Sequence, residues 1–204
     1  KLYEPMRRHT TMLVGGPAQY WVEPHTATAF AKAVNFFKER GIPVRVVGRG
    51  SNLLVRDGGI RGAVIHPAKG EFGDVSVDGN LVTAGAGVRF KKVASAAQAA
   101  GVGGFEWMEG IPGNVGGGLR MNAGAMGMET FDQVVSVTFL DEDGELRTRM
   151  REEIESFYRN VPELRRNYAL KVVFRGKAAS AEEIGAEMDA SKAKRRSSQP
   201  IAAS

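Results

Sequence analysis

The sequence predicts an α+β protein of two units with a ligand cleft between them. Three observations support this fold class. Helical and strand patterns alternate along the chain, and each unit carries one glycine-rich turn. The 204 residues, 43% of them apolar, can bury one good core or two small ones. We place the first unit over residues 1–67, the second over residues 68–178, and a helix with a linker over residues 179–204.

Three elements are predicted in the first unit. Residues 27–40 favour a helix whose apolar face includes Phe30 and Phe37. The mostly β-branched residues 44–47 favour a strand that leads into the first glycine turn. Residues 53–55 follow that turn and favour a short second strand.

The second unit is predicted to contain two hairpins, a helix and a strand. In chain order these are a hairpin over residues 75–84, a helix over residues 90–100, a hairpin over residues 134–148 and a strand over residues 170–174. Both hairpins contain an Asp-Gly pair at the expected turn. A last helix begins at Ser180, where Ser180 and Glu183 form a capping-box pattern.

Two glycine-rich turns, residues 48–55 and residues 110–125, are the most informative segments. The second contains six glycines. Glycine lets another backbone or a ligand approach closely, and bare backbone amides suit a flat or anionic ligand. A lone turn of this kind is as readily a plain connection between two elements. Two such turns in separate units favour a large nucleotide-like ligand held from two sides.

Neither turn has a familiar nucleotide-binding fingerprint. Leu53 stands where a Rossmann turn has glycine or alanine, and a strand and a turn are predicted to follow where a Rossmann fold has a helix. Neither turn contains the Gly-Lys-Ser/Thr of a P-loop. We therefore expect phosphates to be met by loop amides and the Ser51 hydroxyl, not by a long helix.

Composition argues against several classes of function. The formal net charge is +5, but no recognition-helix or aromatic-platform pattern accompanies it, so no nucleic-acid partner is expected. No apolar run approaches the roughly 20 residues that span a bilayer, so no membrane is expected. The chain has no cysteine, which excludes disulfides and suits a reducing compartment. Its three histidines are far apart without ligand spacing, so no metal site is expected.

Seven segments match, in order, the motifs of a known family. They are residues 9–11 with 15–18, 47–55, 57–59, 84–88, 110–117, 122–125 and 157–159. On these motifs the chain resembles the UDP-N-acetylenolpyruvoylglucosamine reductase family, also called UDP-N-acetylmuramate dehydrogenases. The resemblance extends over about residues 6–200.

The resemblance implies a two-subdomain FAD-binding fold of the vanillyl-alcohol-oxidase (PCMH) type. It implies FAD bound without a covalent link, which agrees with the lack of His and Cys in both glycine turns. The cofactor-binding residues are expected to be Gly48, Arg49, Gly50, Ser51, Asn52, Leu53, Gly110, Ile111, Pro112, Gly113, Val115, Gly116, Gly117, Asn122 and Gly124. A Cβ added at Gly50 or Gly113 is expected to enter the space of the cofactor.

The resemblance also implies a reaction. NADPH reduces FAD, and the hydride then passes to the enolpyruvyl group of UDP-N-acetylglucosamine enolpyruvate, giving UDP-N-acetylmuramate. This is a cytoplasmic step of peptidoglycan synthesis, and therefore of cell-wall biogenesis, cell shape and cell division. The family works beside other enzymes of cell-wall precursors.

Arg159 matches the family's catalytic arginine, and Tyr158 and Arg159 are implied to bind the substrate. Without the family, Arg159 would be interpreted as one more surface arginine in a basic stretch. The family continues with Asp-Ser after this arginine, whereas the chain continues with Asn160 and Val161. The family's proton donor and catalytic glutamate lie in a third, substrate-binding domain after residue 200, and Ser204 is interpreted as a linker serine. This domain is expected to be missing here, so the chain alone should bind FAD and be inactive.

Two other interpretations stay open. The first is another flavin-dependent oxidase or dehydrogenase of the same fold, acting on a hydroxyacid or a sugar lactone. The motif formed by Tyr158 and Arg159 argues against it. The second is a non-catalytic nucleotide-binding module, for which a colourless purified protein would be the sign.

Overall fold

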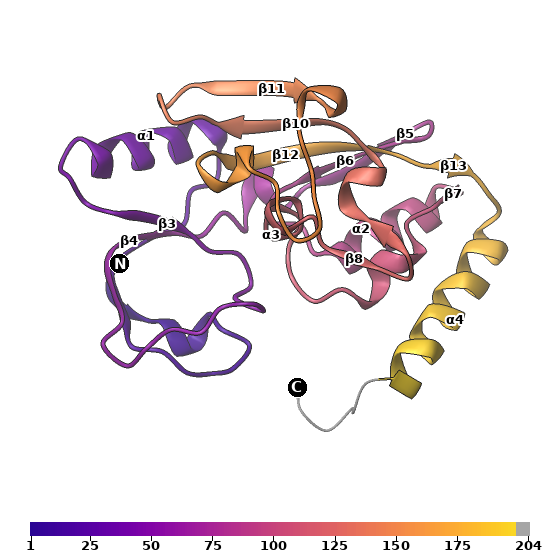
Figure 1. Ribbon diagram of the computed structural model, residues 1–204, viewed down its shortest axis with the longest axis horizontal. Helices are drawn as coiled ribbons and strands as arrows, with labels where there is room; N and C mark the ends of the chain where they lie inside the picture. Colours follow the sequence, from indigo (N-terminus) through magenta and orange to yellow (C-terminus); the bar gives the residue numbers. More distant parts are fainter. Residues whose placement is uncertain (199–204) are drawn as a thin grey trace.

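The computed structural model describes residues 1–198, with side-chain surroundings up to Lys194. Ser204 and the end of the predicted linker lie outside the described residues. Two sheets organise the chain (Figure 1). The strands of the first sheet, in spatial order, are β1 (Leu2–Pro5), β2 (Pro17–Val22), β4 (Ile60–Ile65) and β3 (Val44–Val46). Those of the second are β11 (Leu146–Met150), β10 (Val134–Leu140), β12 (Tyr168–Arg175), β6 (Leu81–Gly85) and β5 (Val75–Asp78).

The first sheet is mixed, because β1 is antiparallel to β2 whereas β2 and β3 are both parallel to β4. The helix predicted over residues 27–40 is confirmed as α1 (Ala27–Lys38), and it buries Phe30 and Phe37 as expected. Its first turn is capped by Thr26, whose side-chain oxygen accepts a hydrogen bond of 3.1 Å from the backbone N–H of Ala29.

The second sheet is antiparallel throughout, and both of its predicted hairpins are confirmed. The helices that follow are α2 (Phe90–Ala99), α3 (Val115–Met121) and α4 (Ala181–Ser198). In Figure 1, α2 and α3 lie below the sheet and α4 leads away from it. The capping box at the start of α4 is present, since Ser180 and Glu183 each accept a hydrogen bond from the backbone N–H of the other.

The remaining elements are short. Two small antiparallel pairs join β7 (Val102–Gly103) to β13 (Lys177–Ala178) and β8 (Gly124–Ala125) to β9 (Met128–Glu129). The single-turn 3-10 helices are η1 (Met6–Arg8), η2 (Gly70–Gly73), η3 (Glu106–Gly110), η4 (Thr130–Asp132), η5 (Arg151–Glu153) and η6 (Glu163–Arg165).

Two local predictions are wrong. Residues 53–55 form no strand. The chain turns first, with the N–H of Gly59 donating to the carbonyl of Arg56, and strand pairing begins only after this turn, in β4. Residues 110–125 are not a plain turn, because the short helix α3 lies within them. Val115 and Leu119, one helical turn apart, are fully buried, and this packing offsets the low helix propensity of the glycines between them.

Apolar side chains join the two sheets. One cluster brings Phe30 of α1 and Ile65 of β4 together with Phe72, Leu140 and Leu170 from the second half of the chain. A larger cluster lies under the second sheet and includes α2, α3 and the start of α4. The first cluster packs residues from both sides of residue 67 together. The unit boundaries at residues 67 and 178 stay predictions.

Candidate cofactor site

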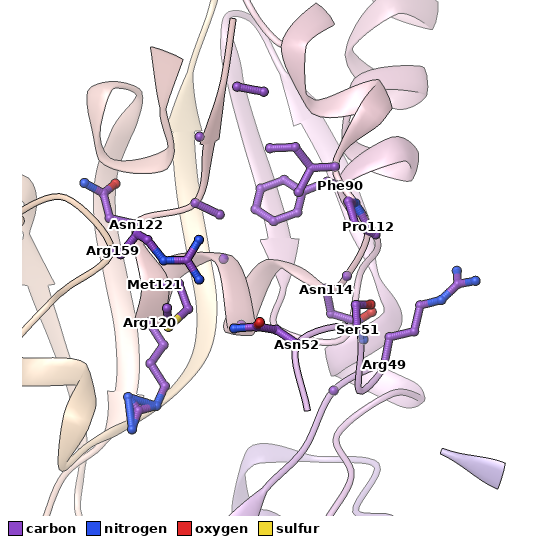
Figure 2. A pocket seen from close by; sticks show the side chains of 18 of the residues that line it. Arg49, Ser51, Asn52, Phe90, Pro112, Asn114, Arg120, Met121, Asn122 and Arg159 are labelled. Atoms are coloured by element: carbon purple, nitrogen blue, oxygen red, sulfur yellow. The ribbon is translucent and has the colours of Figure 1, made fainter. Parts of the chain in front are cut away.

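A cavity of about 960 Å³ opens between the two predicted glycine turns. We call residues 47–53 the first glycine loop and residues 110–114 the second. The cavity is also lined by α3, by residues 122–125 and 127–129, and by the turn that carries Tyr158 and Arg159. Figure 2 shows Ser51 and Asn114 on one side of it and Arg159 on the other.

The two glycine loops approach each other closely. A Cβ on Gly48 would lie 3.4 Å from the Cβ of Asn114, and a Cβ on Gly113 would lie 3.8 Å from the Oγ of Ser51. Gly113 has a φ of +118°, which side chains other than glycine's rarely tolerate. The small residues therefore let both backbones border one cavity.

Gly50 has a different role from the one predicted. Its φ is +68°, and a Cβ there would overlap the carbonyl oxygen of His9 and come within 2.9 Å of the Cα of Thr10. That Cβ would enter the segment beneath the first glycine loop and not the cavity. The expected cofactor contact of a Gly50 side chain is therefore wrong, and glycine is required there by internal packing.

The cavity fits an anionic nucleotide. The Ser51 hydroxyl oxygen is buried and has no hydrogen-bond partner, which is costly unless a ligand supplies one. A Cβ on Gly117 would meet nothing within 4 Å, so this residue of α3 faces open space in the cavity. Arg49, Arg120 and Arg159 all line the cavity, and none forms an ion pair within the described part of the chain.

Most of the predicted site residues line this cavity. Gly48, Arg49, Gly50, Ser51, Asn52, Leu53, Ile111, Pro112, Gly113, Gly117, Asn122, Gly124, Tyr158 and Arg159 do so. Gly110, Val115 and Gly116 do not. The N–H groups of Val115 and Gly116 donate to the carbonyls of Val88 and Ala86, each at 2.8 Å, so they face the protein interior. We do not keep these three residues in the site.

Sequence reasoning missed other residues of the cavity. They are Val46, Val47, Phe90, Asn114, Gly118, Arg120, Met121, Ala123, Ala125, Gly127, Met128, Glu129 and Asp132. Arg120 could have been found, because it is the only cation between the glycines of residues 110–125. Phe90 could not have been found in this way, because in the sequence it looks like any other apolar residue on the buried face of α2.

Arg159 lies in a tight turn with an unusual backbone. Two hydrogen bonds close the turn, from the N–H of Phe157 to the carbonyl of Asn160 at 2.8 Å and from the N–H of Asn160 to the carbonyl of Phe157 at 3.1 Å. Arg159 has a φ of +53°, a left-handed conformation that costs a non-glycine residue about 1–3 kcal/mol. Its guanidinium points into the cavity in Figure 2, whereas Tyr158 is 82% exposed at the rim.

Two searches of the described residues bear on other classes of site. No described helix is both long and apolar enough to cross a membrane. No group of three or more His, Cys, Asp or Glu side chains within residues 1–198 is placed to hold a metal ion.

Comparison with known proteins gives a consistent result. Residues 18–149 match the family model described as FAD binding domain. UDP-N-acetylenolpyruvoylglucosamine reductase of Agathobacter rectalis is 41% identical over 213 residues, which cover 97% of this chain and 67% of the relative. The enzyme of the same name from Azorhizobium caulinodans is 41% identical over 197 residues, covering 97% of this chain and 63% of the relative. The chain thus spans about two thirds of the length of these relatives.

Solved structures agree. The crystal structure of UDP-N-acetylenolpyruvylglucosamine reductase from Thermus caldophilus has a TM-score of 0.84 and 33% identity, over 98% of this chain and 70% of that chain. A solvent-stable cholesterol oxidase, at 18% identity and a TM-score of 0.62, shares the fold alone. The two glycine loops, the cavity and these similarities lead to one assignment. The chain belongs to the UDP-N-acetylenolpyruvoylglucosamine reductase family and has the FAD-binding region of that family, in the α+β fold of the PCMH type.

Proposed function

We propose that the chain binds FAD non-covalently in the cavity between the two glycine loops. The observation that carries this proposal is the buried, unpartnered Ser51 hydroxyl in a cavity lined by glycine backbone and arginines. A phosphate oxygen would accept the Ser51 hydrogen bond, and the arginines would favour the negative charge. No His or Cys in either glycine loop offers a covalent attachment.

The proposed activity of the whole protein is reduction of the enolpyruvyl group of UDP-N-acetylglucosamine enolpyruvate by a hydride and a proton, giving UDP-N-acetylmuramate for peptidoglycan synthesis in the cytoplasm. For residues 1–204 alone we propose FAD binding without turnover, because the resemblance places the family's proton donor after residue 200. FAD, when bound, would supply hydride transfer from NADPH to that substrate. The names of the relatives support this substrate class. Other enzymes of cell-wall precursor synthesis would supply the substrate and use the product.

Arg159 is the residue of this chain proposed to act on the substrate. Hydride addition to an enolpyruvyl double bond places negative charge on the neighbouring carboxylate group. A guanidinium offers two parallel N–H groups to such a carboxylate, so Arg159 would bind and stabilise it. Tyr158, exposed at the rim, would contact the substrate on entry.

The test begins with the purified chain, which is loaded with FAD and then separated from unbound FAD. A flavin absorption spectrum, with all the FAD released on denaturation, is expected. Anaerobic NADPH should then bleach the flavin. When the chain is joined to the family's substrate-binding domain, UDP-N-acetylglucosamine enolpyruvate should perturb the spectrum of the bound oxidised flavin. A chain that cannot be loaded with FAD would overturn the proposal. Bleaching by hydroxyacids or sugar lactones, without NADPH, would favour an oxidase or dehydrogenase of the same fold.

A further inference from the structure

We propose that Asn122 is a positioning residue: it holds the turn of Arg159 against the end of α3. This inference deepens the proposed function, because it rests on the assignment of Arg159 to the substrate. It also changes the expected role of Asn122, whose side chain was predicted to bind the cofactor.

The turn of Arg159 needs support from outside itself. The turn is closed by its own two hydrogen bonds, but Arg159 sits in a left-handed conformation that its side chain disfavours. Such a conformation persists where the surroundings hold it. The side chains of Phe157 and Tyr158 within the turn are 53% and 82% exposed, so apolar packing of the turn's own side chains supplies little of this support; the buried Val161 anchors only the residue after the turn.

Asn122 supplies a direct contact. Its Nδ2 donates one hydrogen bond of 3.2 Å to the carbonyl of Phe157 and one of 2.7 Å to the Oε2 of Glu129. Its Oδ1 accepts a hydrogen bond of 3.1 Å from the N–H of Phe131. A side-chain amide has two N–H donors, and both are used here, so Asn122 has none left for a ligand. The residue is 3% exposed, as expected of an internal brace.

Asn122 and its partner Glu129 are themselves held by hydrogen bonds from their backbone N–H groups. Asn122 ends α3 with a φ of +41°, and its backbone N–H donates to the carbonyls of Gly118 and Leu119. Glu129, the second partner of the amide, donates its own N–H to the Oδ2 of Asp132 at 2.7 Å. The brace therefore connects the turn of Arg159 to α3 and to η4, two elements that border the cavity.

Arg151 holds the segment that leads into the turn. The Arg151 guanidinium donates to the carbonyl of Phe131 at 2.9 Å, to the carbonyl of Ile154 at 2.7 Å and to the Oγ of Ser156 at 3.0 Å. Phe131 is thus bonded to both residues: its N–H donates to the Oδ1 of Asn122, and its carbonyl accepts from Arg151. Asn122 is the one of the two that contacts the turn itself, at Phe157.

The first experiment measures hydrogen exchange on the chain without FAD. Asn122→Gly removes the side chain and keeps the positive φ without strain. We expect the amides of Phe157 and Asn160 to exchange at least tenfold faster, while core strands such as β12 keep their protection. Asn52→Ala is the matched control, since Asn52 lines the same cavity but is exposed and makes no hydrogen bond that would brace the turn. Unchanged exchange of the turn in Asn122→Gly would overturn the proposal.

The second experiment distinguishes an effect of Asn122 on the position of Arg159 from a general loss of order in the protein. With FAD bound, the midpoint potential of the flavin is measured in Asn122→Gly, in Arg159→Ala and in the double variant. Removing or releasing a cation in the cavity should lower the potential, because the reduced form carries more negative charge. The shift caused by Asn122→Gly should vanish when Arg159 is already absent. The FAD affinity of Asn122→Gly should stay within about threefold of the parent, since both N–H donors of the amide are already bonded within the protein.

Equal shifts in the presence and absence of Arg159 would show that Asn122 acts on the flavin by itself, and would overturn the proposal. A large loss of FAD affinity in Asn122→Gly alone would do the same. Failure of the parent chain to bind FAD would instead overturn the proposed function, and the exchange experiment would still decide whether Asn122 holds the turn.

Discussion

Gly48 lies directly against Asn114, so close that a Cβ added to Gly48 would sit 3.4 Å from the Asn114 Cβ. The two residues belong to the two glycine loops, which come from the two predicted units. Both loops border the cavity, and Ser51 and Gly117 line it. The contact of Gly48 with Asn114 sets the distance between the two loops. A substitution that fills the cavity should therefore lower FAD affinity, whereas one that disturbs the packing of the loops should lower stability.

Gly117→Val should block FAD binding while leaving the protein folded. The new side chain would enter open space in the cavity, because nothing lies within 4 Å of a Cβ there. Valine is a slightly better helix former than glycine, so stability should not fall. We expect FAD affinity to drop at least tenfold, as measured by titration of the flavin absorbance, with an unchanged midpoint of unfolding.

The control for this change is Gly58→Val. Gly58 also has open space around its Cβ position, but it lies outside the cavity. This variant should bind FAD like the parent chain. Equal affinities for all three proteins would show that FAD does not occupy the cavity.

Gly50→Ala should act on stability first. The alanine Cβ would overlap the carbonyl oxygen of His9, and the positive φ adds about 1–2 kcal/mol of strain. We expect a loss of about 2 kcal/mol or more in the free energy of unfolding measured with urea. Gly41→Ala is the matched control, because Gly41 has a similar φ of +64° with nothing within 4 Å of its Cβ position. If both variants lose the same free energy, the overlap with His9 contributes nothing.

Gly50 and Gly117 show what the sequence alone could not predict. The pattern of residues 48–55 and 110–125 correctly predicted two loops on one cavity, because repeated glycine signals close approach. It could not show which side of a loop each missing side chain would occupy. Gly50 faces the segment beneath it, whereas Gly117 faces the cavity, and only the tertiary structure separates these cases.

The same limit applies to the elements. The helix α1, the hairpins and the capping box at Ser180 were predictable, because each depends on residues close together in the chain. The helix α3 was missed, because its formation depends on burying Val115 and Leu119 under the sheet and not on helix propensity. The hydrogen bond from Asn122 to the turn of Arg159 could not be predicted for a related reason, since its partner Phe157 is distant in sequence.

Arg159→Lys should weaken substrate binding without affecting FAD. Lysine keeps the charge but loses the planar pair of N–H donors that matches a carboxylate. With FAD bound and the chain joined to the family's substrate-binding domain, we expect about tenfold weaker binding of UDP-N-acetylglucosamine enolpyruvate, measured by the change in flavin absorbance. Arg45→Lys, at an exposed position of β3 outside the cavity, should bind it like the parent. Substrate binding that is unchanged in Arg159→Lys would remove Arg159 from the proposed site.

The stability of the protein should depend on pH through His66, beneath the first glycine loop. The Nδ1–H of His66 donates a hydrogen bond of 2.8 Å to the carbonyl of Val47, the residue at which that loop begins. The ring lies half-buried, with its centroid 5.1 Å from that of Trp21. Burial lowers the pKa of His66 below its ordinary value of 6.5, although the bond to Val47 partly opposes this.

A lowered pKa means that the unfolded chain takes up the His66 proton first as the pH falls. The stability that neutral His66 provides is therefore complete above about pH 6.5 and declines as the pH falls toward the folded-state pKa. His66→Gln cannot titrate and keeps an N–H donor, so its stability should be flatter between about pH 7.5 and pH 5. Urea unfolding across this range measures the difference.

The carboxylate of Glu4 provides the internal control for that experiment. A hydrogen bond from His9 at 3.0 Å holds the pKa of Glu4 below its ordinary value of 4.5. The stability due to Glu4 is present above that value and is lost only as the pH falls below it, so His66→Gln should keep this more acidic decline. The interpretation would be wrong if His66→Gln and the parent chain lost the same free energy between about pH 7.5 and pH 5, because the decline in that window would then come from other groups.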